Sequence, residues 1–131
     1  MKAIVYTETG GPEVLKLVDR PDPEPTGDEV VVRVAVSGVN PTDWKARTGD
    51  GPGRRLAFPE IVPNMDGAGT IVAVGADVDP SRVGERVWLW EAARHRANGS
   101  AQEVVALPAK QAVPLSEERR STSERASASP P

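Results

Sequence analysis

Residues 29–39 read EVVVRVAVSGV, and this stretch decides the fold class. The valines at the even-numbered positions from 30 to 36 share one face of an extended chain, whereas Val31, Arg33 and Ala35 share the other. Such alternation with a period of two is typical of an antiparallel strand that has one face in the core and the other in water. The sequence therefore predicts a half-buried strand at this position.

Shorter strand signals recur on both sides of this stretch, with turn residues between them. They lie at 2–6, 14–18, 69–75, 85–90, 101–107 and 112–113. Prolines at 21, 23 and 25 interrupt any ladder, because proline has no N–H to donate. We therefore expect a mainly β fold, either a sandwich or a partly open barrel. Trp88 and Trp90 fall on one face of their segment, which favours packing in the core or at an interface.

One short helix is expected at 41–48, directly after the long strand. Asn40 suits the N-cap and Pro41 the first helical position, since a proline there loses no hydrogen bond. Asp43 in the first turn interacts favourably with the helix dipole, and Gly49 is suited to end the helix. One short helix leaves the mainly β prediction unchanged.

The end of the chain differs from the rest in composition. Residues 116–131 read SEERRSTSERASASPP and contain no Val, Ile, Leu, Met or aromatic residue. Such a segment cannot offset the entropy of ordering by burying apolar surface. We therefore expect a folded domain over 1–115 and a disordered tail over 116–131.

Composition excludes several classes of protein and of site. The chain of 131 residues is long enough for one domain, and its lack of Cys excludes disulfides, a thiolate nucleophile and a Cys-ligated zinc. Sixteen basic and 19 acidic residues give a net charge of −3, which is too balanced to indicate nucleic acid as a partner. The single histidine, His95, lies between two arginines, and we expect it to be a solvated loop residue.

The N-terminus gives no targeting or membrane signal. Its apolar run extends only from Ala3 to Tyr6. A secretory signal needs about 7–15 apolar residues and a membrane helix about 20. We therefore expect a cytoplasmic protein that makes no membrane contact.

The glycine-rich stretch at 67–75 invites comparison with a dinucleotide-binding loop. The spacing differs, because Val72 stands where the third glycine of G-x-G-x-x-G belongs. The stretch also precedes a strand, whereas a phosphate-binding loop follows a strand and opens a helix. These glycines therefore indicate a close approach between backbones at the start of a strand.

Two polar clusters remain as candidate sites. Asn40 and Asp43 lie at the corner between strand and helix, and they serve either as helix cap and first-turn carboxylate or as groups that orient a ligand in a cleft. Asn64 and Asp66 follow Pro63, so they either form a turn or contribute to a site. Residue types and spacing leave both alternatives open and indicate no mechanism.

The order of several segments resembles the N-terminal, GroES-like catalytic domain of medium-chain dehydrogenases/reductases, in particular the zinc-free quinone oxidoreductase (zeta-crystallin-like) branch. The segments are MKAIVYTETGGPEVLKL at the N-terminus, EVVVRVAVSGVNPTDWKARTG at 29–49, PEIVPNMDGAGTIVAVGADV at 59–78 and VGERVWLW at 83–90. The resemblance covers residues 1 to about 115. It implies a GroES-like, partly open β-barrel with one or two short helices.

The resemblance also implies that no zinc is bound. Zinc-dependent members of the family have Cys at the position of Asn40 and His at the position of Met65. An amide and a thioether supply neither the thiolate nor the imidazole that zinc prefers. The chain therefore resembles the zinc-independent branch at both positions.

Carried over residue by residue, the resemblance implies a site for cofactor and substrate. In this branch the hydride comes from NADPH, and the protein positions it toward a quinone or an enone. Asn40 would hydrogen-bond the cofactor or the substrate, Asp43 would order the catalytic corner, and Trp44 would form a wall of the quinone pocket. The remaining pocket residues, at the position of the missing zinc, would be Asn64, Met65 and Asp66.

The sequence departs from the family after AVPL at 112–115. Family members continue there into a helix and a Rossmann domain with a glycine-rich pyrophosphate loop, whereas this sequence turns into the polar tail. We therefore expect a truncated chain that does not bind NADPH tightly, is inactive alone, and self-associates or forms a homodimer through an open face. Two hypotheses follow: the catalytic-domain portion of an NADPH:quinone oxidoreductase, or a non-catalytic GroES-like binding module.

Overall fold

The structure, a computed structural model, describes residues 1–49 and 56–115, so the expected tail over 116–131 lies outside the described residues. The strands within these ranges are β1 (Lys2–Val5), β2 (Lys16–Asp19), β3 (Glu29–Gly38), β4 (Asp66–Val74), β5 (Arg86–Leu89), β6 (Val104–Pro108) and β7 (Ala112–Pro114). The helices are α1 (Pro41–Thr48) and three single 3-10 turns, η1 (Pro12–Val14), η2 (Pro80–Arg82) and η3 (Ala109–Gln111). In the described ranges, no helix has the length and apolar character needed to cross a membrane.

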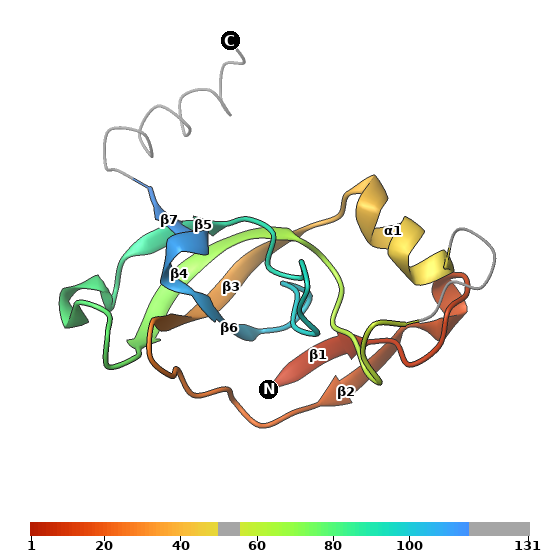
Figure 1. Cartoon of the computed structure of the whole chain (residues 1–131), viewed down its shortest axis with the longest axis horizontal. Helices are drawn as coiled ribbons and strands as arrows, with labels where there is room; N and C mark the ends of the chain where they lie inside the picture. The colour runs from red at the N-terminus through yellow and green to blue at the C-terminus, as the bar shows by residue number, and fades with distance from the viewer. Residues whose placement is uncertain (50–55, 116–131) are drawn as a thin grey trace, which may run out of the picture.

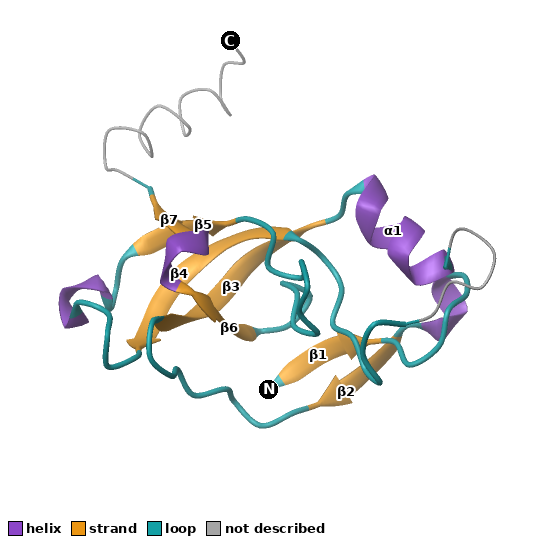
Figure 2. Cartoon of the chain, in the orientation of Figure 1, coloured by secondary structure: helices purple, strands orange, loops and turns teal. Residues whose placement is uncertain are grey.

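The strands form two antiparallel sheets (Figures 1 and 2). β1 pairs with β2, and the larger sheet has the order β6-β3-β4-β5-β7. The segment before β6 joins the sheets, because Ile4 N–H donates to the Ala101 carbonyl at 2.9 Å and Glu103 N–H donates to the Lys2 carbonyl at 2.9 Å. No pairing joins β6 to β7 in the described part of the chain, so the barrel is not closed. The predicted mainly β, partly open fold is confirmed.

The long strand β3 departs from the predicted alternation at two valines. Val34 pairs with Gly69 and Val36 pairs with Ala68, so one residue of β3 is unpaired between them in a bulge. The bulge inverts the facing of the strand, which leaves Val36 63% exposed where a core position was predicted. Val31, predicted to face water, is 3% exposed between its cross-strand neighbours on β4 and β6.

The apolar core lies against the inner face of the larger sheet. Its buried side chains are Val30, Val32, Ile71, Val78, Val87, Leu89, Ala92, Val105, Leu107 and Ala112. On β5 the alternation places Val87 and Leu89 inward, so Trp88 faces outward and is 37% exposed. Trp88 therefore lies outside this core, which leaves packing at an interface as the alternative for it, and Trp90, half-buried, lies just after the strand.

Four strands begin at other positions than predicted: β5 begins at Arg86 rather than 85, β6 begins at Val104 rather than 101, and β2 and β4 differ as follows. Pro12 opens η1, which takes Val14 out of the second strand, and β2 begins at Lys16. β4 begins at Asp66, before the predicted glycine, because Asp66 pairs with Gly38 at the end of β3. The prediction of a close backbone approach is confirmed at Gly69, where a Cβ would lie 2.1 Å from the Arg33 carbonyl oxygen.

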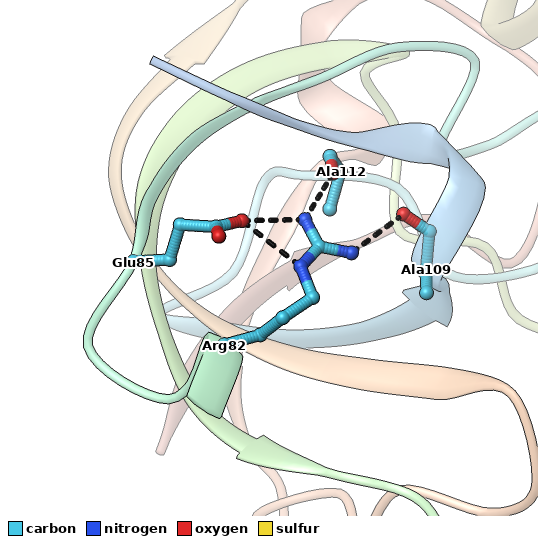
Figure 3. Close-up of polar contacts among 4 residues, drawn as sticks. All are labelled: Arg82, Glu85, Ala109 and Ala112. Carbon is cyan, nitrogen blue, oxygen red and sulfur yellow. Dashed lines mark hydrogen bonds and ion pairs between the residues drawn. The ribbon is translucent and has the colours of Figure 1, made fainter. Parts of the chain in front are cut away.

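Arg82, the last residue of η2, connects η2 to η3 and β7 through hydrogen bonds (Figure 3). Its Nε and Nη2 donate to Glu85 Oε1 at 2.9 and 2.6 Å. Nη1 donates to the Ala109 carbonyl at 3.3 Å, and Nη2 also donates to the Ala112 carbonyl at 2.7 Å. The guanidinium thus satisfies a carboxylate and two backbone oxygens, and such charge-assisted bonds are stronger than neutral ones.

Candidate functional site

The corner between β3 and α1 is built by local sequence rules. Asn40 is extended and caps the helix, and its backbone N–H donates to Asp43 Oδ2 at 2.6 Å, which is one half of a capping box. Pro41 occupies the first helical position, and Gly49 ends α1 with a left-handed φ of 68°. The predicted helix and its caps are confirmed.

A hydrogen bond joins this corner to the start of β4. The Asn40 side-chain amide donates to Asp66 Oδ2 at 2.7 Å. The two residues lie at neighbouring strand ends, because Gly38 of β3 pairs with Asp66 of β4. Two of the predicted site residues are thus in direct contact.

Asn64 lies in a second polar cluster beside the first. It is 9% exposed and has a left-handed φ of 81°, a conformation that Asn tolerates better than most residues. Its amide donates to Ser37 Oγ at 2.8 Å, and Ser37 Oγ lies 2.9 Å from Ser100 Oγ. Ser100 Oγ in turn donates to the Asp66 backbone carbonyl at 2.6 Å. This chain of contacts fixes the Asn64 side chain.

Asp43 is the buried charge of the site, with 8% exposure. Burial raises the pKa of its carboxyl, and the nearby Asp66 carboxylate raises that pKa further. The backbone N–H groups of Asn40 and Met65 hydrogen-bond to the carboxylate and oppose the shift. Asp43 therefore connects α1 to the segment before β4.

A cavity of about 200 Å³ opens beside these residues. Its lining comprises Tyr6, Thr42, Asp43, Ala46, Leu56, Ala57, Phe58, Ile61, Pro63, Asn64, Met65, Ala93, His95 and Arg96. It is smaller than the roughly 300–1,000 Å³ of sites for drug-sized ligands, so it suits a compact ring. Apolar walls with a few polar groups are typical of small-molecule sites.

The predicted site residues divide into three groups. Asp43, Asn64 and Met65 line the cavity. Asn40 and Asp66 are not in the lining. Asn40 hydrogen-bonds the lining residue Asp43, and Asp66 hydrogen-bonds Asn40. Trp44 also lies outside the lining and is 44% exposed on α1. The Lys45 ammonium lies 5.8 Å from the centroid of the Trp44 ring.

Tyr6, His95 and Arg96 also line the cavity, although none of them was predicted as a site residue. Tyr6 follows β1, and His95 and Arg96 lie in the loop after β5. His95 is an exposed loop residue as predicted, but it also borders the cavity and has a left-handed φ of 55°. The basic run at 94–96 was a signal for this wall, whereas Tyr6 reaches the cavity only through the pairing of its backbone with Ile61.

The described residues show neither a group of metal ligands nor a glycine-rich loop that opens a helix. Over residues 1–49 and 56–115, no three His, Asp or Glu side chains gather as metal ligands. The glycines at 67–75 lie along β4 and its end and open no helix. The N-terminus of α1 already holds a carboxylate, that of Asp43, where a phosphate would bind.

Comparison with known proteins gives consistent matches. The family model of the alcohol dehydrogenase GroES-like domain matches residues 26–117. A quinone oxidoreductase of Lama guanicoe is 43% identical over 67% of this chain and 26% of its own. An NADPH-dependent alkenal/one oxidoreductase of Arabidopsis thaliana chloroplasts is 38% identical over 67% of this chain and 23% of its own.

Solved structures agree with these matches. A mycobacterial protein complexed with NADPH superposes with a TM-score of 0.73 at 33% identity, covering 90% of this chain and 34% of that one. The chain spans about a quarter of the length of the curated relatives it matches.

Proposed function

The chain belongs to the family of alcohol dehydrogenase GroES-like domains, and from that premise we propose that it provides the substrate side of an NADPH-dependent oxidoreductase acting on a quinone or an enone. The observation that carries the proposal is the cavity bordered by Asp43, Asn64 and Met65. Relatives named quinone oxidoreductase and alkenal/one oxidoreductase support the substrate class. We also propose that the protein is cytoplasmic and that it works without zinc.

The residues of the corner would hold and orient the reactants. When bound, NADPH supplies the hydride. Asn40 would hydrogen-bond the nicotinamide end of the cofactor or the substrate, and its own amide is oriented by Asp66. Asp43 would keep the helix start in place, because its carboxylate binds the backbone N–H groups of Asn40 and Met65. The apolar walls at Phe58 and Ile61 would exclude water from the ring of the substrate.

Trp44 has a more distant role in this proposal. It is exposed on α1 outside the lining of the cavity, so it would border the entrance rather than the ring of the substrate. Asp66 would act through Asn40, and Asn64 would form a polar part of the wall.

The described residues form a place for a compact ring but no cradle for the diphosphate of NADPH. We therefore propose that the 131-residue chain does not bind NADPH tightly and does not turn over quinones by itself. Remote binding energy positions the reacting atoms, so its loss lowers turnover as well as affinity. The same observation, a helix N-terminus filled by Asp43, favours a second candidate function, a GroES-like binding module without turnover.

An NMR titration of the chain with 2-cyclohexen-1-one tests the substrate side. We expect saturable shifts at the amides of Asn64 and Met65, with the amide of Val113 on β7 unchanged. Ala46→Leu adds bulk at an exposed helix position that borders the cavity, so it should weaken binding several-fold. Lys45→Leu is the matched control, since Lys45 does not border the cavity and should leave binding unchanged.

The contrary result is equally defined. Shifts that do not saturate, or shifts confined to the exposed sheet face around Trp88, would contradict the proposal that this cavity is the substrate site.

A further inference from the structure

Tyr6, the single tyrosine of the chain, forms one wall of the cavity from a fixed backbone. Its N–H donates to the Ile61 carbonyl at 2.9 Å, and the Ile61 N–H donates back to the Tyr6 carbonyl at 3.0 Å. The residue is only 2% exposed, although it borders the cavity. Its ring is therefore held at the wall and is closed to bulk water.

Two polar groups of this wall, Asn64 and Asp43, form hydrogen bonds within the protein, whereas Arg96 Nη1 in the same lining is buried without a partner among the described residues. The Asn64 amide donates to Ser37 Oγ at 2.8 Å. The Asp43 carboxylate accepts the backbone N–H groups of Asn40 and Met65. These bonds help to hold the cavity in shape, one N–H of the Asn64 amide is engaged by Ser37, and the ionised Asp43 carboxylate has no proton to donate.

The Tyr6 hydroxyl is different. Within the described ranges, no residue forms a hydrogen bond with it. A tyrosine hydroxyl at a largely buried position normally has a hydrogen-bond partner, and a ligand in the cavity that Tyr6 borders can supply one. Thr42 and His95 also border the cavity, but both are exposed, so water satisfies their polar groups.

The surroundings keep the Tyr6 phenol protonated at neutral pH. Burial raises its pKa from an ordinary value that is already near 10, and the Asp43 carboxylate raises it further. The Arg47 guanidinium lowers that pKa and so opposes the shift. A protonated phenol is a hydrogen-bond donor, and apolar neighbours such as Phe58 and Ile61 strengthen a bond made beside them.

We propose that the phenolic hydroxyl of Tyr6 donates a hydrogen bond to the carbonyl oxygen of the quinone or enone in this cavity. The inference rests on the proposed function, because it assigns a residue to the same site. It makes the carbonyl group, rather than ring shape alone, the feature that the cavity recognises. Tyr6 is thereby a binding residue that also polarises the carbonyl for reduction.

The test compares two probes and two proteins. The probes are 2-cyclohexen-1-one and cyclohexene, which share the ring and differ in the carbonyl oxygen. The proteins are the full chain and Tyr6→Phe, which keeps the buried ring and removes only the hydroxyl. We expect the full chain to prefer the ketone, and Tyr6→Phe to bind the ketone about three- to tenfold more weakly, the value of one hydrogen bond. Binding of cyclohexene should be the same in both proteins.

A labelled chain gives a readout that needs no variant. Tyrosine labelled with carbon-13 at Cζ produces one signal, since the chain has one tyrosine. That signal should shift saturably with the ketone and stay constant with cyclohexene. A constant signal under saturating ketone would overturn the inference.

The outcomes separate the inference from the proposed function. If both proteins bind the ketone equally well in the cavity, the role of Tyr6 is wrong and the proposed function stands. If neither protein binds either probe, the proposed function fails and the inference fails with it.

Discussion

The two halves of the barrel contrast in what holds them together. At the end with η2, the buried core side chains are apolar, and Arg82 is paired with Glu85 and with two carbonyl oxygens. At the end with α1, on the opposite side of the molecule in Figure 1, the buried polar side chains of Asp43 and Asn64 border a cavity whose other walls are mainly apolar. Apolar burial stabilises a fold, whereas buried polar groups lower its stability unless they are paired. The contrast indicates that the first half supplies stability and the second half supplies the site.

The largest expected effect is in the apolar half. Ile71→Ala removes a fully buried side chain from the core of β4 and should lower the free energy of unfolding by about 2–5 kcal/mol. Val72→Ala, at the exposed neighbouring position, should change it by less than about 1 kcal/mol. Urea unfolding measures both values. Equal losses of unfolding free energy in the two variants would contradict the assignment of Ile71 to the core and Val72 to the outer face.

Arg82→Ala should have the next largest effect. It leaves the Glu85 carboxylate and two carbonyl oxygens without their donor, at a cost of about 2 kcal/mol. Arg86→Ala is the matched control, because Arg86 is exposed on β5 and forms no ion pair with any described residue. Similar urea midpoints for the two variants would show that the hydrogen bonds of Arg82 drawn in Figure 3 add no stability.

In the polar half, substitutions of Asn64 test whether position 64 has the positive φ of 81°. Asn64→Ala and Asn64→Gly both lose the hydrogen bond to Ser37, but only glycine adopts a positive φ without strain. Asn64→Ala should therefore be less stable than Asn64→Gly by about 1 kcal/mol. Thermal unfolding of the two variants gives the difference, and the opposite order would contradict the assigned conformation.

Asp43 should give a smaller effect that depends on pH. Its pKa is raised in the folded state, so the folded chain binds this proton more tightly than the unfolded chain does. The contribution of Asp43 to stability is therefore fully present below the unfolded pKa near 3.9 and is lost as the pH rises through the folded pKa. Subtracting the pH profile of Asp43→Asn from that of the unaltered chain should show this decline. A difference that grows with pH would mean that the hydrogen bonds to the carboxylate outweigh burial.

Zinc should have the smallest effect of all. Asn40 and Met65 offer no thiolate or imidazole, so an added zinc ion should not change the melting temperature. Metal content after dialysis and the melting curve with and without zinc provide the measurement. About one zinc per chain with a gain in stability would contradict the zinc-free site.

Local chemistry explains which parts of the fold were predictable. The strand at 29–38 was predicted from alternation, and the helix at 41–48 was predicted from an N-cap and a glycine stop. Each of these signals lies within the element that it predicts or directly beside it. The exposure of Val36 was not predictable, because it depends on a bulge in the pairing of β3 with β4. The facing of β5 was ambiguous from sequence for another reason, because both alternating sets are apolar, and the structure buries Val87 and Leu89 rather than Trp88.

The candidate site was predictable in part. The resemblance named Asn64 and Met65, which line the cavity, and it named Trp44, which the structure places outside the lining. Tyr6 was absent from the prediction, because its approach to the cavity results from a bridge between segments 55 residues apart in the chain, at positions 6 and 61. Contacts of this kind depend on tertiary pairing rather than on any local pattern.

The central claim is that this chain carries the substrate side of the site and not the part that holds the cofactor. A fluorescence titration of the 131-residue chain with NADPH, followed by a steady-state assay with a simple quinone, tests it most directly. The account predicts no saturation at micromolar NADPH and no turnover above the uncatalysed rate, in a chain that still binds 2-cyclohexen-1-one. Micromolar binding of NADPH together with steady turnover would contradict it.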